Sequence, residues 1–219
     1  MKRLLNWIKK YPLFLLAIIC LLIGVWIIKS VLLQGRIIAI DTYFLQFLFS
    51  VRNSFIVQFF SILTFFGSVT AGLTIILLTT ILFVWRKQHK TGLLFLFGFL
   101  CADGTAYLLK YFFQRARPDL IYRAVTETSF ALPSGHATTS AFIFGLLGFL
   151  ALLRFKTKRI HIIIIAMVLI CILLIDFSRL YLGVHFFSDV LLGNTIGFFF
   201  LFVTISVYKW LLNEHRLKK

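Results

Sequence analysis

The sequence is poor in acidic residues, with only 7 Asp and Glu among its 219 residues, and it holds just 3 prolines and 3 cysteines. Hydrophobic residues make up 61% of the chain, and the mean hydropathy is +0.99. A soluble core of this size cannot bury so much apolar surface, whereas a lipid bilayer can accommodate it. The composition therefore excludes an ordinary soluble domain and favours an integral membrane protein.

The cysteines and the net charge of +16 each exclude a class of function. Cys20, Cys101 and Cys171 lie in separate apolar segments, which predicts small buried hydrophobic side chains and neither a disulfide nor a metal site. The basic residues form short clusters between apolar segments and do not line a groove. They predict membrane topology and contacts with anionic lipid headgroups, with no nucleic acid as a partner.

Long apolar runs predict six membrane-spanning helices in an all-α, single-domain bundle over residues 1–219, without repeats or linkers. The charge-free stretch from Tyr11 to Ile28 is longer than a signal-peptide core and predicts an uncleaved first helix. The expected spans are residues 11–29, 68–86, 91–113, 136–153, 160–178 and 187–209.

The segment 30–67 is apolar but interrupted by glycine and charged residues, which predicts one or two short helices along the membrane interface. Asp41 and Ser54 are the expected N-caps of these helices. The alternative is one long helix over 54–86, although Gly67 favours a break. With the N-terminus inside, fifteen Lys and Arg residues fall on the cytoplasmic side and eight on the outer side, so both termini are expected in the cytoplasm.

Ionisable residues gather at three places on the predicted outer side. In the first, Lys110 is followed seven residues later by Arg117 and then by Pro118. If the helix continues, the two cations lie about two turns apart on one face and can hold an anion, and Pro118 stops the helix. The alternative is that Lys110 merely extends its charge to the interface.

The second place is the run Pro133, Ser134, Gly135 and His136, just before the fourth predicted span. A Ser-Gly pair that opens a helix presents free backbone N–H groups and the positive end of the helix dipole, and this arrangement binds phosphate. His136 then lies at the helix start, where it can donate a proton. The alternative is a simple Ser134 N-cap beside an incidental histidine.

The third place contains Arg179, Gly183, His185 and Asp189. The spacing of His185 and Asp189 puts them on one face if the segment is helical, and a carboxylate on one imidazole nitrogen leaves the other free as nucleophile or base. Arg179 adds a planar cation suited to phosphate oxygens. A structural pair that caps the sixth helix is the alternative. A metal site also competes, but three nearby cations would repel a divalent metal and attract phosphate.

The three patterns K-x6-RP, PSGH and SR-x5-H-x3-D, in this order within 110–189, resemble the signature motifs of the phosphatidic acid phosphatase type 2 family, which is related to vanadium haloperoxidases. The resemblance implies His185 as the nucleophile that forms a phosphohistidine, Asp189 as its orienting partner, and His136 as the acid and then the base. It implies phosphate binding by the remaining motif residues, which are Lys110, Arg117, Ser134, Gly135 and Arg179. It implies no metal and no cofactor.

Some polar residues lie outside these motifs. Asp103 and Asp176 are either buried ion-pair partners of the phosphate ligands or helix residues satisfied by a neighbour. Arg123 and Glu127 belong to the segment 115–135, which is expected to form a lip over the substrate, and neither is assigned a role.

The resemblance implies a membrane-embedded lipid phosphatase, and the distribution of Lys and Arg places its active site at the outer face of the plasma membrane. Phosphatidylglycerophosphate, phosphatidic acid and undecaprenyl diphosphate are the substrates it implies, and the residues do not separate them. The alternatives are a phosphotransferase that uses a non-water acceptor and a non-enzymatic lipid transporter with this fold. The sequence does not define the oligomeric state.

Overall fold

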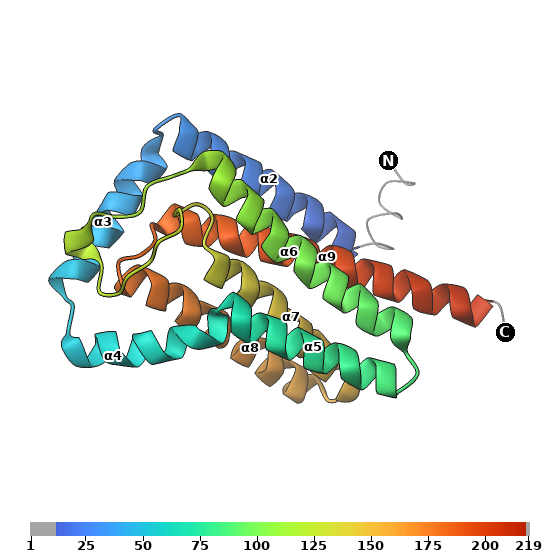
Figure 1. Cartoon of the computed structure of the whole chain (residues 1–219). Helices are drawn as coiled ribbons and strands as arrows, with labels where there is room; N and C mark the ends of the chain where they lie inside the picture. Colours follow the sequence, from blue (N-terminus) through green and yellow to red (C-terminus); the bar gives the residue numbers. More distant parts are fainter. Residues whose placement is uncertain (1–11, 218–219) are drawn as a thin grey trace.

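The computed structural model describes residues 12–217, which form helices joined by short connections, without any strand (Figure 1). The long helices are α2 (Pro12–Leu32), α5 (Val69–Trp85), α6 (His89–Phe113), α7 (Gly135–Arg154), α8 (Lys158–Tyr181) and α9 (Phe187–Leu217). Shorter helices are α3 (Arg36–Ser50), α4 (Ser54–Leu63), η1 (Thr64–Gly67) and η2 (Leu120–Tyr122). The predicted all-α class is thus confirmed, while the predicted start of the first span at residue 11 and the basic residues 1–10 lie outside the described part.

Five of these helices, α2, α6, α7, α8 and α9, are long and apolar enough to cross a membrane. Each coincides with a predicted span. The remaining predicted span corresponds to α5, which has 17 residues. It becomes a sixth candidate only when joined to the segment Ser54–Gly67 across a bend of 40°. The chain is therefore a membrane protein with five candidate spans and a sixth, broken candidate.

The break between α4 and α5 follows from local capping. The chain leaves α4 through the 3-10 turn η1, and Ser68 then takes an extended conformation with ψ of 152°. Its hydroxyl accepts a hydrogen bond from the Ala71 amide at 3.1 Å and so starts α5 anew. The expected break near Gly67 is present, and the alternative of one long helix over 54–86 is wrong.

The expected short helices between the first two long ones are α3 and α4, but their N-caps differ from the prediction. Gly35 precedes α3, and Asp41 lies inside that helix on its buried face. Asn53, one residue before Ser54, caps α4 by accepting a hydrogen bond from the Phe55 amide at 2.8 Å. The Asp41 prediction failed because a carboxylate in a helix can be held by tertiary partners instead of by the first turn.

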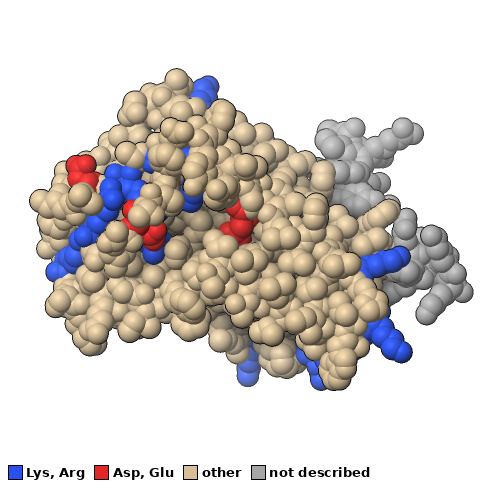
Figure 2. Space-filling model, viewed as in Figure 1, with Lys and Arg blue, Asp and Glu red and all other residues tan. Residues whose placement is uncertain are grey.

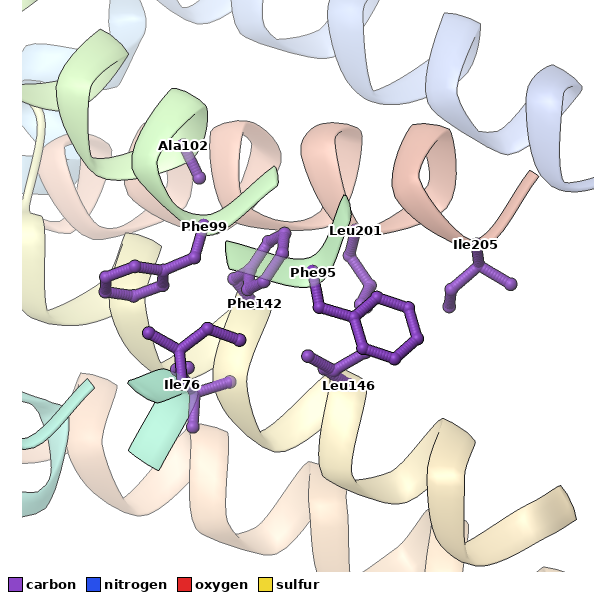
Figure 3. Close-up of a cluster of buried hydrophobic side chains, with 9 residues drawn as sticks. Ile76, Phe95, Phe99, Ala102, Phe142, Leu146, Leu201 and Ile205 are labelled. Atoms are coloured by element: carbon purple, nitrogen blue, oxygen red, sulfur yellow. The ribbon is translucent and has the colours of Figure 1, made fainter. Parts of the chain in front are cut away.

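The core of the bundle lies among α5, α6, α7 and α9. Figure 3 shows Phe95 and Phe99 of α6 near Phe142 of α7, with aliphatic side chains of α5, α7 and α9 completing the cluster. Gly193 and Gly197 of α9 face the first turns of α7, where a Cβ atom at either position would collide with backbone oxygens. Small residues four apart let two membrane helices approach closely, so the starts of α7 and α9 are held together.

The alternating helix directions bring the C-terminal ends of α6 and α8 to the same end of the bundle as the starts of α7 and α9 (Figure 1). Figure 2 shows Lys and Arg side chains concentrated at the two ends of the visible face, with a broad band of mostly uncharged residues between them. This distribution matches a bundle that crosses a bilayer. All three motifs meet at the end of the bundle that also carries α3.

Candidate active site

The first motif does not continue as a helix. α6 ends at Phe113 because Gln114 adopts the left-handed conformation, with φ of 46°. The expectation that Lys110 and Arg117 share one helix face, with Pro118 as the stop, is therefore wrong. Lys110 stays in the last turn of α6, where its Nζ donates to the Phe130 carbonyl at 2.7 Å.

Arg117 reaches the site from the extended loop that follows α6. Its Nε donates to the Ser129 carbonyl at 2.6 Å, and its Nη1 donates to the Val184 carbonyl at 2.7 Å. Nη1 also lies 3.2 Å from Nε2 of His185. The predicted cation and the predicted nucleophile are thus neighbours, but a loop contact brings them together and not a shared helix.

The second motif opens α7 as predicted. Ser134 is the N-cap, and its Oγ accepts from the Ala137 amide at 3.5 Å. The Ser134 amide donates to the Asp189 carbonyl at 2.9 Å, which ties this helix start to the third motif. A Cβ atom on Gly135 would lie 4.0 Å from the Lys110 Cε, so the lysine stem borders the free helix N-terminus. His136 follows in the first turn of α7, close to the cationic side chains of Arg179, Lys110 and Arg117.

The third motif forms a tight turn between α8 and α9. Gly183 has φ of +67°, and a Cβ there would strike the Tyr122 carbonyl, so this position requires glycine. His185 precedes α9, so it does not share a helix face with Asp189 as expected. The turn nevertheless puts His185 Nδ1 3.5 Å from Asp189 Oδ2.

Asp189 is completely buried and is held by other groups as well as facing the histidine. Its Oδ2 accepts from the Phe186 amide at 2.8 Å, and its Oδ1 accepts from Arg115 Nη1 at 2.6 Å. Both proposed roles of this residue, helix cap and imidazole partner, are therefore compatible in one position. With Nδ1 facing the carboxylate, Nε2 carries the imidazole lone pair toward Arg117.

Arg179, from the last turn of α8, is the largest fully buried side chain among the described residues. Its Nη1 donates to Thr64 Oγ1 at 3.0 Å, and its Nη2 pairs with a carboxylate oxygen of Glu127. Its Nε has no hydrogen-bond partner among the described residues. A buried donor without a partner is costly, and an anion bound at this place would satisfy it.

Burial and nearby positive charge together lower the pKa values of two loop residues, His185 and Arg117. Burial lowers the pKa of His185 well below its usual value, and the charges of Arg117, Arg179 and Lys110 lower it further. Burial also lowers the pKa of Arg117, which the Glu127 carboxylate opposes. His185 is therefore neutral at pH 7, which is the form that a nucleophilic imidazole requires.

Three residues that the sequence analysis did not place in the active site form a network behind Asp189. Arg115 bridges Asp189 and Asp41, with its Nη2 2.8 Å from Asp41 Oδ2. Asp41 also accepts from the amide of Ser188 at 2.8 Å and from its hydroxyl at 2.6 Å. The signal was present: Asp41 shares a helical stripe with apolar positions 37, 45 and 48, and a carboxylate there needs a buried cation.

Glu127 is the fourth unassigned residue, and no local signal in the sequence singles it out. Asp103 and Asp176 are not ion-pair partners of the phosphate ligands. Asp103 Oδ1 accepts from the Thr139 hydroxyl at 2.8 Å, and Asp176 Oδ2 accepts from the Asn194 amide at 2.6 Å, so each carboxylate is paired with a neighbour. The second oxygen of each has no hydrogen-bond partner among the described residues, so the neighbours satisfy these side chains only in part. No three His, Cys, Asp or Glu side chains in residues 12–212 are arranged to hold a metal ion.

The profile of the PAP2 superfamily matches residues 91–212, more than half of the chain. The chain belongs to the PAP2 superfamily. The matched region contains all three motifs, so the resemblance drawn from them is confirmed.

Two curated relatives of this PAP2 protein are named as phosphatases. Phosphatidylglycerophosphatase B of Bacillus subtilis (strain 168) is 35% identical over 124 residues, which cover 56% of this chain and 60% of the relative. Undecaprenyl-diphosphatase of Sulfolobus acidocaldarius is 26% identical over 134 residues, which cover 59% of this chain and 61% of the relative. The chain thus spans about three fifths of the length of these two relatives.

Solved structures establish the PAP2 fold. The crystal structure of a transmembrane PAP2-type phosphatidylglycerolphosphate phosphatase from Bacillus subtilis matches with a TM-score of 0.78 at 23% identity, covering 88% of this chain and 96% of that chain. Aquifex aeolicus LpxE matches with a TM-score of 0.59 at 21% identity, covering 75% of this chain and 94% of that chain.

Proposed function

We propose that this PAP2 protein hydrolyses the phosphate monoester or diphosphate of a membrane lipid through a phosphohistidine on His185, without a metal. The observation that carries the proposal is a buried imidazole with Asp189 3.5 Å from Nδ1 and Arg117 3.2 Å from Nε2. Nδ1, which has no hydrogen-bond partner among the described residues, thus faces a carboxylate that can orient the ring, and Nε2 faces a cation that we assign to phosphate binding. The names of the two curated relatives support a phosphatase.

In the first step, the Nε2 lone pair attacks phosphorus and the bond from phosphorus to the lipid oxygen breaks. His136 donates a proton to that oxygen, so the lipid leaves as an alcohol or a monophosphate. Arg117, Arg179 and Lys110 bind the equatorial oxygens, on which negative charge is spread in the transition state. Asp189 stabilises the positive charge that His185 gains.

In the second step, His136 takes a proton from water and the water oxygen attacks phosphorus. The phosphorus–nitrogen bond breaks, and His185 returns to its neutral form with release of inorganic phosphate. The surrounding cations favour an anion over a divalent metal, and they support a mechanism that needs no metal.

The substrate class follows from the position of the site at the end of an apolar bundle. A ligand there keeps its phosphate among the cations while its hydrocarbon tail remains in the bilayer. Phosphatidylglycerophosphate and undecaprenyl diphosphate are the first candidates, since the two curated relatives are named for them, and phosphatidic acid is the third.

The proposal is tested by phosphate release from the protein purified in detergent, with a chelator present and the three lipids compared side by side. Chelator-resistant release is the expected result, and the ranking of rates identifies the preferred lipid. Release that requires an added acceptor would indicate a phosphotransferase. Folded protein with no release from any lipid would contradict the proposal and favour lipid transport.

We also propose that the site lies on the outer face of the plasma membrane, with both termini in the cytoplasm. Ile121→Cys at the site end, where the side chain is 70% exposed, should react in intact cells with a thiol reagent that cannot cross the membrane. Lys156→Cys at the opposite end should react only after the membrane is opened. The unmodified chain, with Cys20, Cys101 and Cys171, is the background control. The reverse labelling pattern would invert the topology.

A further inference from the structure

Glu127 occupies the position that the proposed phosphate group needs. One carboxylate oxygen pairs with Arg179 Nη2, and the other lies 3.5 Å from Arg117 Nη2. These are two of the three cations assigned above to phosphate binding. A carboxylate that spans two guanidinium groups in this way is an anionic ligand supplied by the chain itself.

The exposure of the three side chains indicates which of them moves. The side chains of Arg179 and Arg117 are 2% and 4% exposed, whereas that of Glu127 is 26% exposed. Both arginines also have other partners: Thr64 Oγ1 for Arg179, and the Val184 and Ser129 carbonyls for Arg117. The arginines therefore keep their positions when Glu127 leaves, while Glu127 lies on a loop with a path to solvent.

We propose that Glu127 is an internal competitor for the phosphate-binding arginines, which neutralises them in the empty site and helps to expel inorganic phosphate after hydrolysis. The inference rests on the proposed phosphatase function, because the competing ligand is the phosphate that this reaction releases. In the empty site, Glu127 supplies the anion that the two buried guanidinium charges would otherwise lack. When phosphate is bound, the returning carboxylate replaces it on the same donors.

A purely structural role for Glu127 predicts the opposite change in phosphate affinity when this residue is removed. If Glu127 only held Arg179 and Arg117 in place, its removal would loosen them and weaken phosphate binding. If Glu127 competes, its removal strengthens phosphate binding, because the ligand no longer displaces a charge-assisted pair. The sign of the change in phosphate affinity therefore decides between the two roles.

The test compares Glu127→Gln with the wild-type protein, purified in detergent at about pH 8, where a phosphate group is mainly dianionic. Inorganic phosphate is the probe, and its affinity is measured from the shift in melting temperature with concentration. The substituted side chain is nearly isosteric with glutamate and leaves Arg179 an amide oxygen. We expect phosphate to bind the variant at least about tenfold more tightly, with a correspondingly lower inhibition constant for phosphate in the hydrolysis assay.

Two further variants keep the test decisive. Glu127→Asp retains the charge on a shorter stem and should give an intermediate affinity, because it cannot reach both arginines. Asp119→Asn removes an exposed carboxylate from the same loop and should leave phosphate affinity unchanged. Unchanged or weaker phosphate binding by Glu127→Gln would overturn the proposal. Because binding is measured without a lipid substrate, this result is separate from whether the wild-type protein hydrolyses lipids.

Discussion

Replacing His185 with alanine should lower lipid phosphate hydrolysis by about 10⁴-fold or more, because no other group can form the phosphoenzyme bond. The protein should remain folded. Arg117 keeps its bond to the Val184 carbonyl, and Asp189 keeps Arg115 and the Phe186 amide, so the deletion leaves neither charge unpartnered. Phosphate release, with melting temperature and gel-filtration profile alongside, measures both parts of this prediction.

Two other histidine variants provide a comparison and a control for this result. His136→Ala should be nearly as severe for a lipid alcohol, a poor leaving group, and milder for a substrate whose leaving group needs no proton. His89→Ala, an exposed residue at the start of α6, should leave turnover unchanged. Persistent hydrolysis in His185→Ala, with His89→Ala as the matched control, would remove His185 as the nucleophile.

His185→Ala should also alter the dependence of the protein's stability on pH. Burial and the nearby cations hold the pKa of His185 well below 6.5, so below that pH the unfolded chain binds a proton that the folded protein does not. The neutral imidazole therefore lowers stability progressively as the pH falls below about 6.5. The acid-side loss of melting temperature should be smaller in His185→Ala than in the wild-type protein, and equal losses would contradict a neutral buried His185.

Replacing Arg115 with alanine should destabilise the protein by about 3–5 kcal/mol and also impair turnover. Among residues 12–212, whose side chains the structure describes, the Arg115 guanidinium is the only cation that pairs with both Asp41 and Asp189. Their side chains are 1% and 0% exposed, so removing Arg115 leaves two buried carboxylates without a compensating charge. Thermal unfolding in detergent and steady-state turnover provide the measurements.

Coupling to Asp41 distinguishes this network from general damage. In the double variant Arg115→Ala with Asp41→Asn, one of the uncompensated charges is gone, so the loss of stability should be smaller than the sum of the two single losses. Arg115→Lys keeps the charge but lacks the planar fork that reaches both carboxylates, so it should recover only part of the activity. Arg36→Ala, exposed at the start of α3, should change stability by less than about 0.5 kcal/mol. Strict additivity of Arg115→Ala and Asp41→Asn would refute the network.

Local patterns in the chain determined much of this protein. Apolar runs between basic clusters define the long helices, because a span must satisfy its backbone internally and leave its charges at the ends. The Ser134 N-cap follows from local chemistry that involves only neighbouring residues. The tight turn at Gly183, in contrast, requires glycine because of the Tyr122 carbonyl, which is a contact between distant segments. The three motifs were sufficient to indicate the PAP2 family.

Where local patterns were extended over distance, the geometry that they predicted was wrong. Arg117 was expected on the α6 face and His185 on the α9 face, yet both lie in loops. Helical spacing assumes that the helix continues, and the left-handed Gln114 ends α6 before that assumption can apply. The two residues meet because the loop after α6 crosses the turn before α9.

Only the tertiary structure decided the partners of the charged residues. Asp41 looked like a helix cap, and it is instead the buried counter-ion of Arg115, 74 residues further along the chain. No local sequence pattern indicated a role for Glu127, which forms ion pairs with Arg179 and Arg117. The sequence by itself determines which segments enter the membrane and which functional groups are present, because burial of apolar surface and capping depend on near neighbours. The pairing of buried charges depends on which distant groups share a low-dielectric space, and that is decided when the helices pack.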